Sequence, residues 1–242
     1  MHRLVVLSAT YRQSSEADAE TIAKDPENRW LARGPKHRLD AEQIRDSALA
    51  ASGLLVATLG GPSVKPYQPP GVWEDAGTGK SYAQDKGDKL YRRSLYTFWR
   101  RTAPPPNMLT FDATTREVCT AKREVTTTPL QALVLLNDPQ FLEAARNLAE
   151  LEVAAHPDAP RQRAWNLFRR LTGQPPDARE HAILEQLLLE QRRHFESHPD
   201  AAAKYLAVGP KPRNESLPAP EVAATAVLAS ALMNHDAFIM IR

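Results

Sequence analysis

The segment from residue 116 to residue 147 constrains the fold more than any other part of this 242-residue chain. Two polar residues in it each precede a proline, Thr128 before Pro129 and Asp138 before Pro139. Threonine and aspartate cap helix N-termini, and proline fits the first helical turn because the N–H that it lacks would be unpaired there. The apolar run between the two prolines therefore predicts two consecutive helices that meet at the aspartate.

Apolar residues recur at helical spacing over most of the chain, and only 10 residues are glycine. The clearest helix is predicted after Asp40, which can cap it, with Gln43 at the capping-box position and Gly53 at its end. Further helices are predicted at residues 2–10, 90–101, 128–153, 160–173, 177–197 and 221–233. The pattern predicts an all-α fold, an irregular multi-helix domain with long loops rich in glycine and proline.

Residues 60–87 are rich in glycine and proline and show no sustained period, which predicts a long surface loop. The loop carries three aromatic residues, Tyr67, Trp73 and Tyr82. Such rings can stack on the apolar face of a sugar, and they can also pin a loop to its own domain. Both interpretations stay open, so Trp73 is a candidate ligand-binding residue.

The net charge does not favour binding to nucleic acid, because 31 Lys and Arg residues are nearly balanced by 29 Asp and Glu residues, for a net charge of +2. Arginines and aromatic residues alternate in residues 91–101, a pattern that can bind single strands. On a helix those aromatic side chains would face the core, so we expect no nucleic-acid partner. No apolar run approaches eighteen residues, and we expect no membrane span.

Neither the single cysteine nor the histidines predict a metal or haem site. Cys119 stands alone, which excludes an intrachain disulfide, a four-cysteine zinc site and covalent haem in this chain. We expect it to be buried and inert, because no histidine lies near it in sequence. Glu190, His194 and His198 have the spacing of one helix face, but Pro199 follows at once and the segment is polar. An exposed face without metal is the prediction.

Polar residues gather before and within the first of the two proline-led helices. The candidate ligand-binding residues there are Arg116, Arg123, Glu124, Thr127, Gln131 and Asp138. If they converge on a cleft, the arginines could hold an anionic or sugar-like ligand while a carboxylate acts as acid or base. Alternatively, they form an ion-pair and capping network that fixes the two helices, which is the favoured interpretation.

Several motifs of this chain occur in the same order in a known family. They include HRLVVLSATYRQSS, HRLDAEQIRDSALAASG, YRRSLYTFWRRTAPPP, FDATTREVCTAKREVTTTPLQALVLLNDPQF and LMNHDAF. With them the chain resembles the PSD1 family, also called DUF1553, from His2 to Phe238. The chain departs from the family pattern at ARGPKH, which leaves the local helix boundary open.

The resemblance implies a module of large, exported proteins of planctomycete type, in which a companion domain and a cytochrome c domain precede it. It implies a periplasmic or cell-surface location, companion domains of the same parent protein as partners, and haem c on a companion domain only. The chain is expected to be one helical module over residues 1–242, truncated at its N-terminus because the first apolar segment has no cap. Two lobes, residues 1–155 and 156–242, are the alternative.

No catalytic mechanism comes with the resemblance, and the residues do not decide whether the chain is an enzyme. The leading hypothesis is an accessory or scaffold module that binds companion domains and is associated with polysaccharide processing. The alternative is a carbohydrate-active enzyme domain that uses arginine and carboxylate residues between positions 116 and 138.

Overall fold

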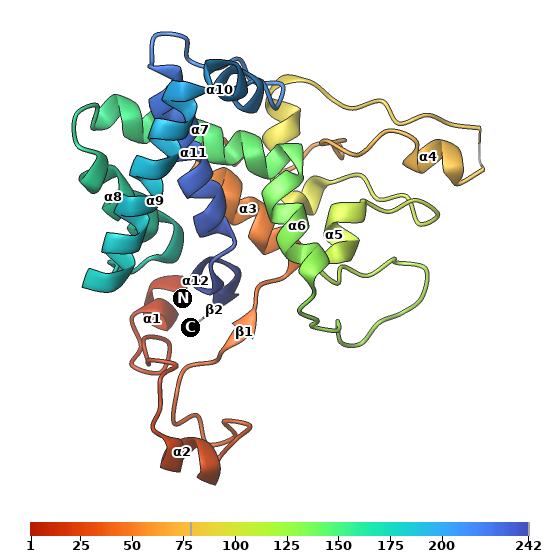
Figure 1. The fold of residues 1–242 in the computed structure, drawn as a ribbon. Coiled ribbons are helices and arrows are strands. Elements are labelled where there is room, and N and C mark those ends of the chain that lie inside the picture. The colour runs from red at the N-terminus through yellow and green to blue at the C-terminus, as the bar shows by residue number, and fades with distance from the viewer. Residues whose placement is uncertain (78, 242) are drawn as a thin grey trace.

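The computed structural model describes residues 1–77 and 79–241 and is mainly α-helical (Figure 1). The body is built by α3 (Ala41–Ala51), α6 (Pro129–Asn137), α7 (Pro139–Ala155), α8 (Pro160–Thr172), α9 (Ala178–Ser197), α10 (Pro199–Leu206) and α11 (Ala219–Met233). The shorter elements are α1 (His2–Val6), α2 (Ala19–Lys24), α4 (Val72–Asp75), α5 (Pro106–Thr110), α12 (Asp236–Ile239) and the 3₁₀ turns η1 (Gly87–Tyr91) and η2 (Ser94–Tyr96). The predicted all-α class is confirmed.

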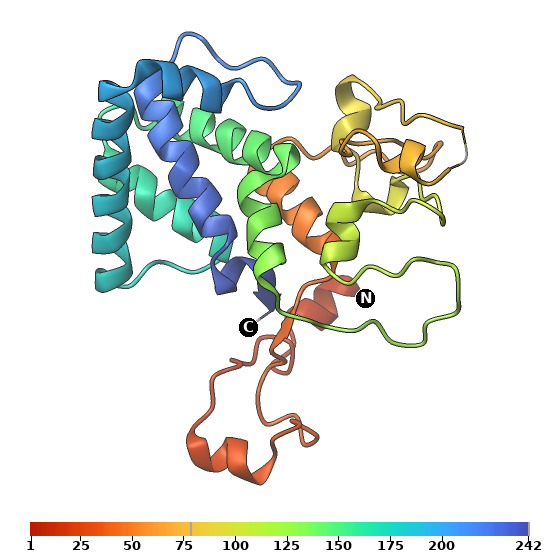
Figure 2. The same cartoon turned by 45° about the vertical axis from the view of Figure 1, so that its right-hand side comes forward.

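The two proline-led helices form as predicted, as α6 and α7. Thr128 and Gln131 make a capping box at the start of α6, and the carboxylate of Asp138 accepts a hydrogen bond of 2.8 Å from the backbone N–H of Gln140. Asp138 is extended, at φ −67° and ψ 126°, and ends one helix while it begins the next. The chain therefore turns sharply there, and Figure 2 shows α6 at an angle to α7.

Helix α11 occupies the centre of the core. It is rich in alanine and leucine and packs against α7, α8, α9 and α10. A helix that is apolar on every side must be covered on every side, and most of the residues of α11 are buried. The buried cluster runs from α3 to α12, so the core is continuous across residue 155, where the alternative of two lobes would divide the chain.

The first 36 residues form an arm that extends from the body in both views (Figures 1 and 2). No residue of α1 or α2 is buried, and α1 is shorter than the helix predicted for residues 2–10. The arm is joined to the body by strand β1 (His37–Arg38), which pairs antiparallel with β2 (Met240–Ile241). The carboxylate of Asp25 folds the far end of the arm by accepting 2.8 Å hydrogen bonds from the backbone N–H groups of Arg29 and Trp30.

The helix predicted for residues 90–101 is wrong. The turns η1 and η2 flank Arg92 instead, and two parallel bridges join Val56 to Arg92 and Val64 to Thr97. The reason is the buried guanidinium of Arg45, which donates hydrogen bonds of 2.7 Å and 2.9 Å to the carbonyl oxygens of Leu90 and Arg92. Those acceptors would otherwise serve a helix, and this extended course satisfies them with a side chain from α3.

Two of the helices that were not predicted begin with a proline. Pro106 begins α5 and Pro199 begins α10, so each occupies the first turn, where proline is tolerated. Proline also cannot continue a preceding helix, so its position alone does not predict a new one.

Candidate functional site

The structure does not bring the predicted site residues to one cleft. Arg116 and Arg123 line a groove of about 740 Å³ beside α3. Gln131 and Asp138 lie at the starts of α6 and α7 and take part in separate hydrogen-bond networks. Trp73 lies in the long loop, within a different cluster. The candidates therefore divide into three groups.

In the groove beside α3, the side chain of Arg123 makes two hydrogen bonds with Glu42. The distances are 2.7 Å from Nη1 to Oε2 and 3.0 Å from Nη2 to Oε1. Burial acts to raise the pKa of Glu42, but the hydrogen bonds and charge of Arg123 outweigh it and lower that pKa. Arg116 stacks on the ring of Trp99, 4.5 Å from its centroid. Both arginines thus hold a loop against the body, and the carboxylate is kept ionised.

Gln131 is buried at the centre of a network that ties α6 to α5 and to β1. Its Nε2 donates hydrogen bonds to the carbonyl oxygens of Thr110 and Thr126, at 2.9 Å and 3.2 Å. The hydroxyl of Thr126 donates to Asp112 at 2.9 Å, and Asp112 in turn pairs with Arg38. Every polar group of this chain of contacts serves packing between elements, as polar networks often do.

Asp138 is engaged in capping α7. Besides the bond from the backbone of Gln140, its second oxygen accepts a hydrogen bond of 3.3 Å from the side chain of Asn107. Burial raises the pKa of Asp138. Glu124 and Thr127 are exposed on the loop before α6. None of these three residues lines the groove that holds Arg116 and Arg123.

Trp73 anchors the long loop. Trp73 is only 6% exposed. Its ring centroid lies 5.2 Å from that of Tyr82, which it meets edge-on, and 5.8 Å from that of Phe98. The cations of Arg100 and Lys65 lie 4.6 Å and 5.2 Å from the ring centroid. The ring pins the loop to the body, and little of it is available for stacking on a sugar.

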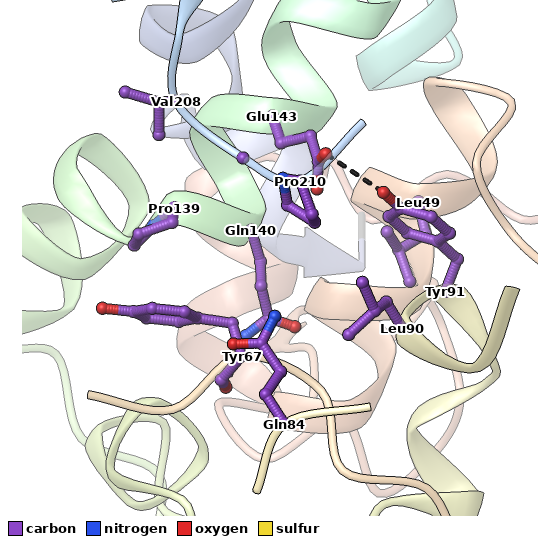
Figure 3. A pocket seen from close by; sticks show the side chains of 11 residues that line it. Leu49, Tyr67, Gln84, Leu90, Tyr91, Pro139, Gln140, Glu143, Val208 and Pro210 are labelled. Carbon is purple, nitrogen blue, oxygen red and sulfur yellow. Dashed lines mark hydrogen bonds between the residues drawn. The ribbon is translucent and has the colours of Figure 1, made fainter. Parts of the chain in front are cut away.

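A partly open pocket of about 340 Å³ lies elsewhere, between α3, α7, η1 and the linker that follows α10 (Figure 3). Its walls are mostly apolar or aromatic and include Leu49, Tyr67, Leu90, Tyr91 and Pro139. Ligand sites are typically concave, largely apolar and equipped with a few polar groups. Because its lining comes from segments far apart in the chain, this pocket leaves no local signal in the sequence.

The charged group of the pocket is Glu143, on the second turn of α7 and only 3% exposed. One oxygen, Oε1, accepts hydrogen bonds from the hydroxyl of Tyr91 at 3.0 Å and from the backbone N–H of Lys211 at 2.7 Å. The guanidinium of Arg146 lies 3.6 Å from the same oxygen. Burial raises the pKa of Glu143, and burial together with the charge of Glu143 raises the pKa of Tyr91.

One sequence signal for Glu143 did exist. Glu143, Arg146 and Asn147 fall at helical spacing among the buried apolar residues of α7, where charged side chains are rare unless they are paired. Polar residues on the core side of an amphipathic helix are a reason to look for a partner elsewhere in the chain.

Within the described residues, no group of three or more His, Cys, Asp or Glu side chains is placed to hold a metal ion. The rings of His194 and His198 stack, with their centroids 4.6 Å apart. The expected burial of Cys119 is wrong, because it lies exposed on the loop before α6. Among residues 1–77 and 79–241, no helix has the length and apolarity needed to cross a bilayer.

The family assignment rests on a match over most of the chain. The model of the family described as PSD1, protein of unknown function (DUF1553), matches residues 1–188. The chain belongs to the PSD1 family. The match includes the arm, the Arg123 groove, α6 and Glu143, and it ends within α9, before the linker that closes the pocket. No curated protein and no solved structure matches this PSD1 chain.

Proposed function

We propose that this PSD1 chain is a non-catalytic binding module that docks against companion domains of an exported, cytochrome-linked parent protein associated with polysaccharide processing. The observation that carries the proposal is the exposure of large apolar side chains on the arm and on one face of α6. The exposed residues include Leu4, Leu7, Trp30 and Leu31 on the arm and Leu130, Leu133 and Leu136 on α6. Exposed apolar surface of this kind commonly marks an interaction site.

Helix α6 supports the proposal most directly. Gln131 and Leu135 face the body, while Leu130 and Leu133, which are 56% and 54% exposed, face outward one turn apart. The helix contains no charged residue. A helix face meant for water normally carries charged side chains, so this face is suited to an apolar protein surface.

A companion domain on the same polypeptide is the occupant that fits these faces best. A tethered partner is present at a high effective concentration, so a patch of modest size is enough to hold it. A lipid surface fits less well, because helices that lie in a membrane interface carry Lys and Arg on their polar side and α6 has neither. The family resemblance supports companion domains beside this module, and haem would be carried by one of them.

The engaged state of the carboxylates supports binding over carbohydrate catalysis at residues 116–138. Glycoside hydrolysis needs two carboxylates on either side of the scissile bond, one of them able to give a proton. In this region burial raises the pKa of Asp138, but its carboxylate is bound in a helix cap outside the groove. The nearby Glu42 is held ionised by Arg123, and Glu124 is exposed outside the groove. We therefore place polysaccharide with the parent protein as a whole and not at an active centre in this chain.

A matched pair of variants tests the proposal. Leu133→Asp places a charge on the exposed face of α6, and Leu59→Asp does the same at a loop residue that is 78% exposed and lies outside that face. We expect Leu133→Asp to weaken binding of the companion domains, supplied as a separate polypeptide, by tenfold or more in calorimetry. Leu59→Asp should bind as the wild type does. Equal binding by the two variants would refute docking through α6.

A further inference from the structure

We propose that the pocket at Glu143 is a binding site for a neutral, flat-ringed ligand of the phenol class, whose hydroxyl donates a hydrogen bond to Glu143 Oε2. This site is distinct from the exposed faces of the arm and α6, and it does not depend on the docking role.

Glu143 Oε2 is an acceptor that the protein leaves open. Both hydrogen-bond donors, the Tyr91 hydroxyl and the Lys211 N–H, bind Oε1. No hydrogen bond within the described residues reaches Oε2, and this oxygen keeps contact with the solvent of the pocket, although the residue as a whole is only 3% exposed. A ligand that displaces this solvent must supply a donor to Oε2, because a carboxylate oxygen left without one is costly. Figure 3 shows this carboxylate beside Tyr91 and Pro210, at the edge of the pocket.

The surrounding charges select a neutral donor over a cation. The guanidinium of Arg146 lies 3.6 Å from Oε1, and it also donates hydrogen bonds to the carbonyl oxygens of Leu206 and Lys211. The ammonium of Lys211 is held by Asn147 at 2.6 Å. The charge of Glu143 is therefore already balanced by Arg146, which disfavours a cationic ligand.

The position of the carboxylate is fixed by the linker. Gly209 has φ +93°, and a Cβ at that position would lie 2.6 to 2.8 Å from the side-chain carbons of Glu143. Only a glycine lets the backbone approach so closely. The linker thus presses on the aliphatic part of Glu143 and closes the pocket on one side, which gives Oε2 a defined place before any ligand arrives.

The walls select a flat ring with few polar groups. The rings of Tyr67 and Tyr91 line the pocket together with Leu49, Leu90 and Pro139, and aromatic side chains favour offset or edge contacts with another ring. The side-chain amide of Gln140, which also lines the pocket, already has partners. Its oxygen accepts a hydrogen bond from Arg45 Nε at 2.7 Å, and its nitrogen donates one to the backbone carbonyl of Tyr67 at 3.3 Å.

A sugar would fare worse than a phenol in this pocket. A pyranose brings several hydroxyl groups, and each one that is buried without a partner costs free energy. Gln140 is occupied and Gln84 is exposed to solvent, so Glu143 Oε2 is the acceptor on the buried side of the pocket, and a phenol has one donor to match it. The volume of about 340 Å³ is at the small end of ligand pockets, which suits a molecule of one or two rings.

The test is a titration of the whole chain, followed by NMR at the backbone amides around the pocket, with four probes. The probes are p-cresol, toluene as the same shape without a donor, benzylamine as a cation, and methyl glucoside as a sugar. We expect p-cresol to bind at least about tenfold more tightly than each of the other three, as one hydrogen bond to a buried charged acceptor allows. Equal or tighter binding of toluene, benzylamine or the glucoside would overturn the proposal.

Three variants test whether p-cresol binds in the pocket at Glu143. Glu143→Gln keeps the shape of the side chain but replaces the charged acceptor, so p-cresol should bind about tenfold more weakly while toluene changes little. Glu150→Gln is the matched control, because Glu150 lies on the same helix and accepts a hydrogen bond from Asn214 of the linker, outside the pocket. Val208→Phe fills the pocket from the half-buried linker and should abolish binding even if Glu143→Gln does not fold. Retained p-cresol binding in Val208→Phe would refute this location.

Discussion

Replacement of Arg123 by alanine should loosen the loop before α6 without unfolding the body. The two hydrogen bonds to Glu42 join this loop to α3, at 2.7 Å and 3.0 Å, and the two side chains are 32% and 23% exposed. Fully exposed ion pairs contribute about 0.2–1 kcal/mol, and a paired, partly buried geometry lies at or above the top of that range. We expect a coupling free energy of about 1 kcal/mol between Arg123 and Glu42.

The assay is a double-mutant cycle in urea with Arg123→Ala, Glu42→Ala and the combined variant. For a domain of this size, a loss of about 1 kcal/mol lowers the melting temperature by roughly 2–4 °C. Lys122→Ala, at the exposed neighbouring residue, is the control and should change the melting temperature little. The coupling should also fade as the pH falls through the lowered pKa of Glu42, since protonation removes the charge that Arg123 holds.

A coupling near zero would refute the view that this pair serves packing. If Arg123→Ala left the melting temperature unchanged but abolished binding of an anionic or sugar ligand, the cluster predicted from the sequence would be a ligand site after all.

Three further perturbations follow from buried or anchoring side chains. In Glu143→Gln, the free energy of unfolding should depend less on pH: burial raises the folded-state pKa of Glu143 above the usual 4.5, so the wild type loses stability as the pH rises through that window. Urea curves of both proteins from pH 4 upward check this, and parallel curves would contradict it. Arg163→Met should lower the free energy of unfolding by about 3 kcal/mol in chemical denaturation, because the fully buried guanidinium pairs with Glu221. Glu221 keeps one partner in this variant, Arg192 at 2.8 Å. A loss below about 1 kcal/mol would be inconsistent with the pairing of Arg163 and Glu221. Trp73→Ala should speed proteolytic cleavage within residues 60–87 while the helical circular dichroism stays unchanged, and equal cleavage would show that the ring is not the anchor.

Local signals in the sequence were enough for the helices that are decided by their own ends. The capping residues of α3, α6 and α7 are neighbours in sequence of the N–H groups that they satisfy, so Asp40, Thr128 and Asp138 were identified correctly. The all-α class followed from the spacing of apolar residues, which the continuous core around α11 confirms.

Features that depend on contacts between residues far apart in the chain could not be predicted from the sequence. Residues 90–101 have helical spacing, yet their carbonyl groups are bound by Arg45, forty-five residues before Leu90. The pocket was invisible for the same reason, because Glu143, Tyr91 and the linker at Gly209 meet only in the folded chain. Residues 116–138 form one polar cluster in the sequence. In the fold, the turn at Asp138 and the loop before α6 separate them, so their side chains contact different partners.

Amide hydrogen exchange is the most direct test of the docking role. Exchange in the isolated chain should be compared with exchange in the intact parent protein, peptide by peptide. We expect slower exchange in the parent at residues 1–7, 28–33 and 129–137, and unchanged exchange at the exposed loop around Leu59. Identical exchange at the arm and α6 in both proteins would contradict it.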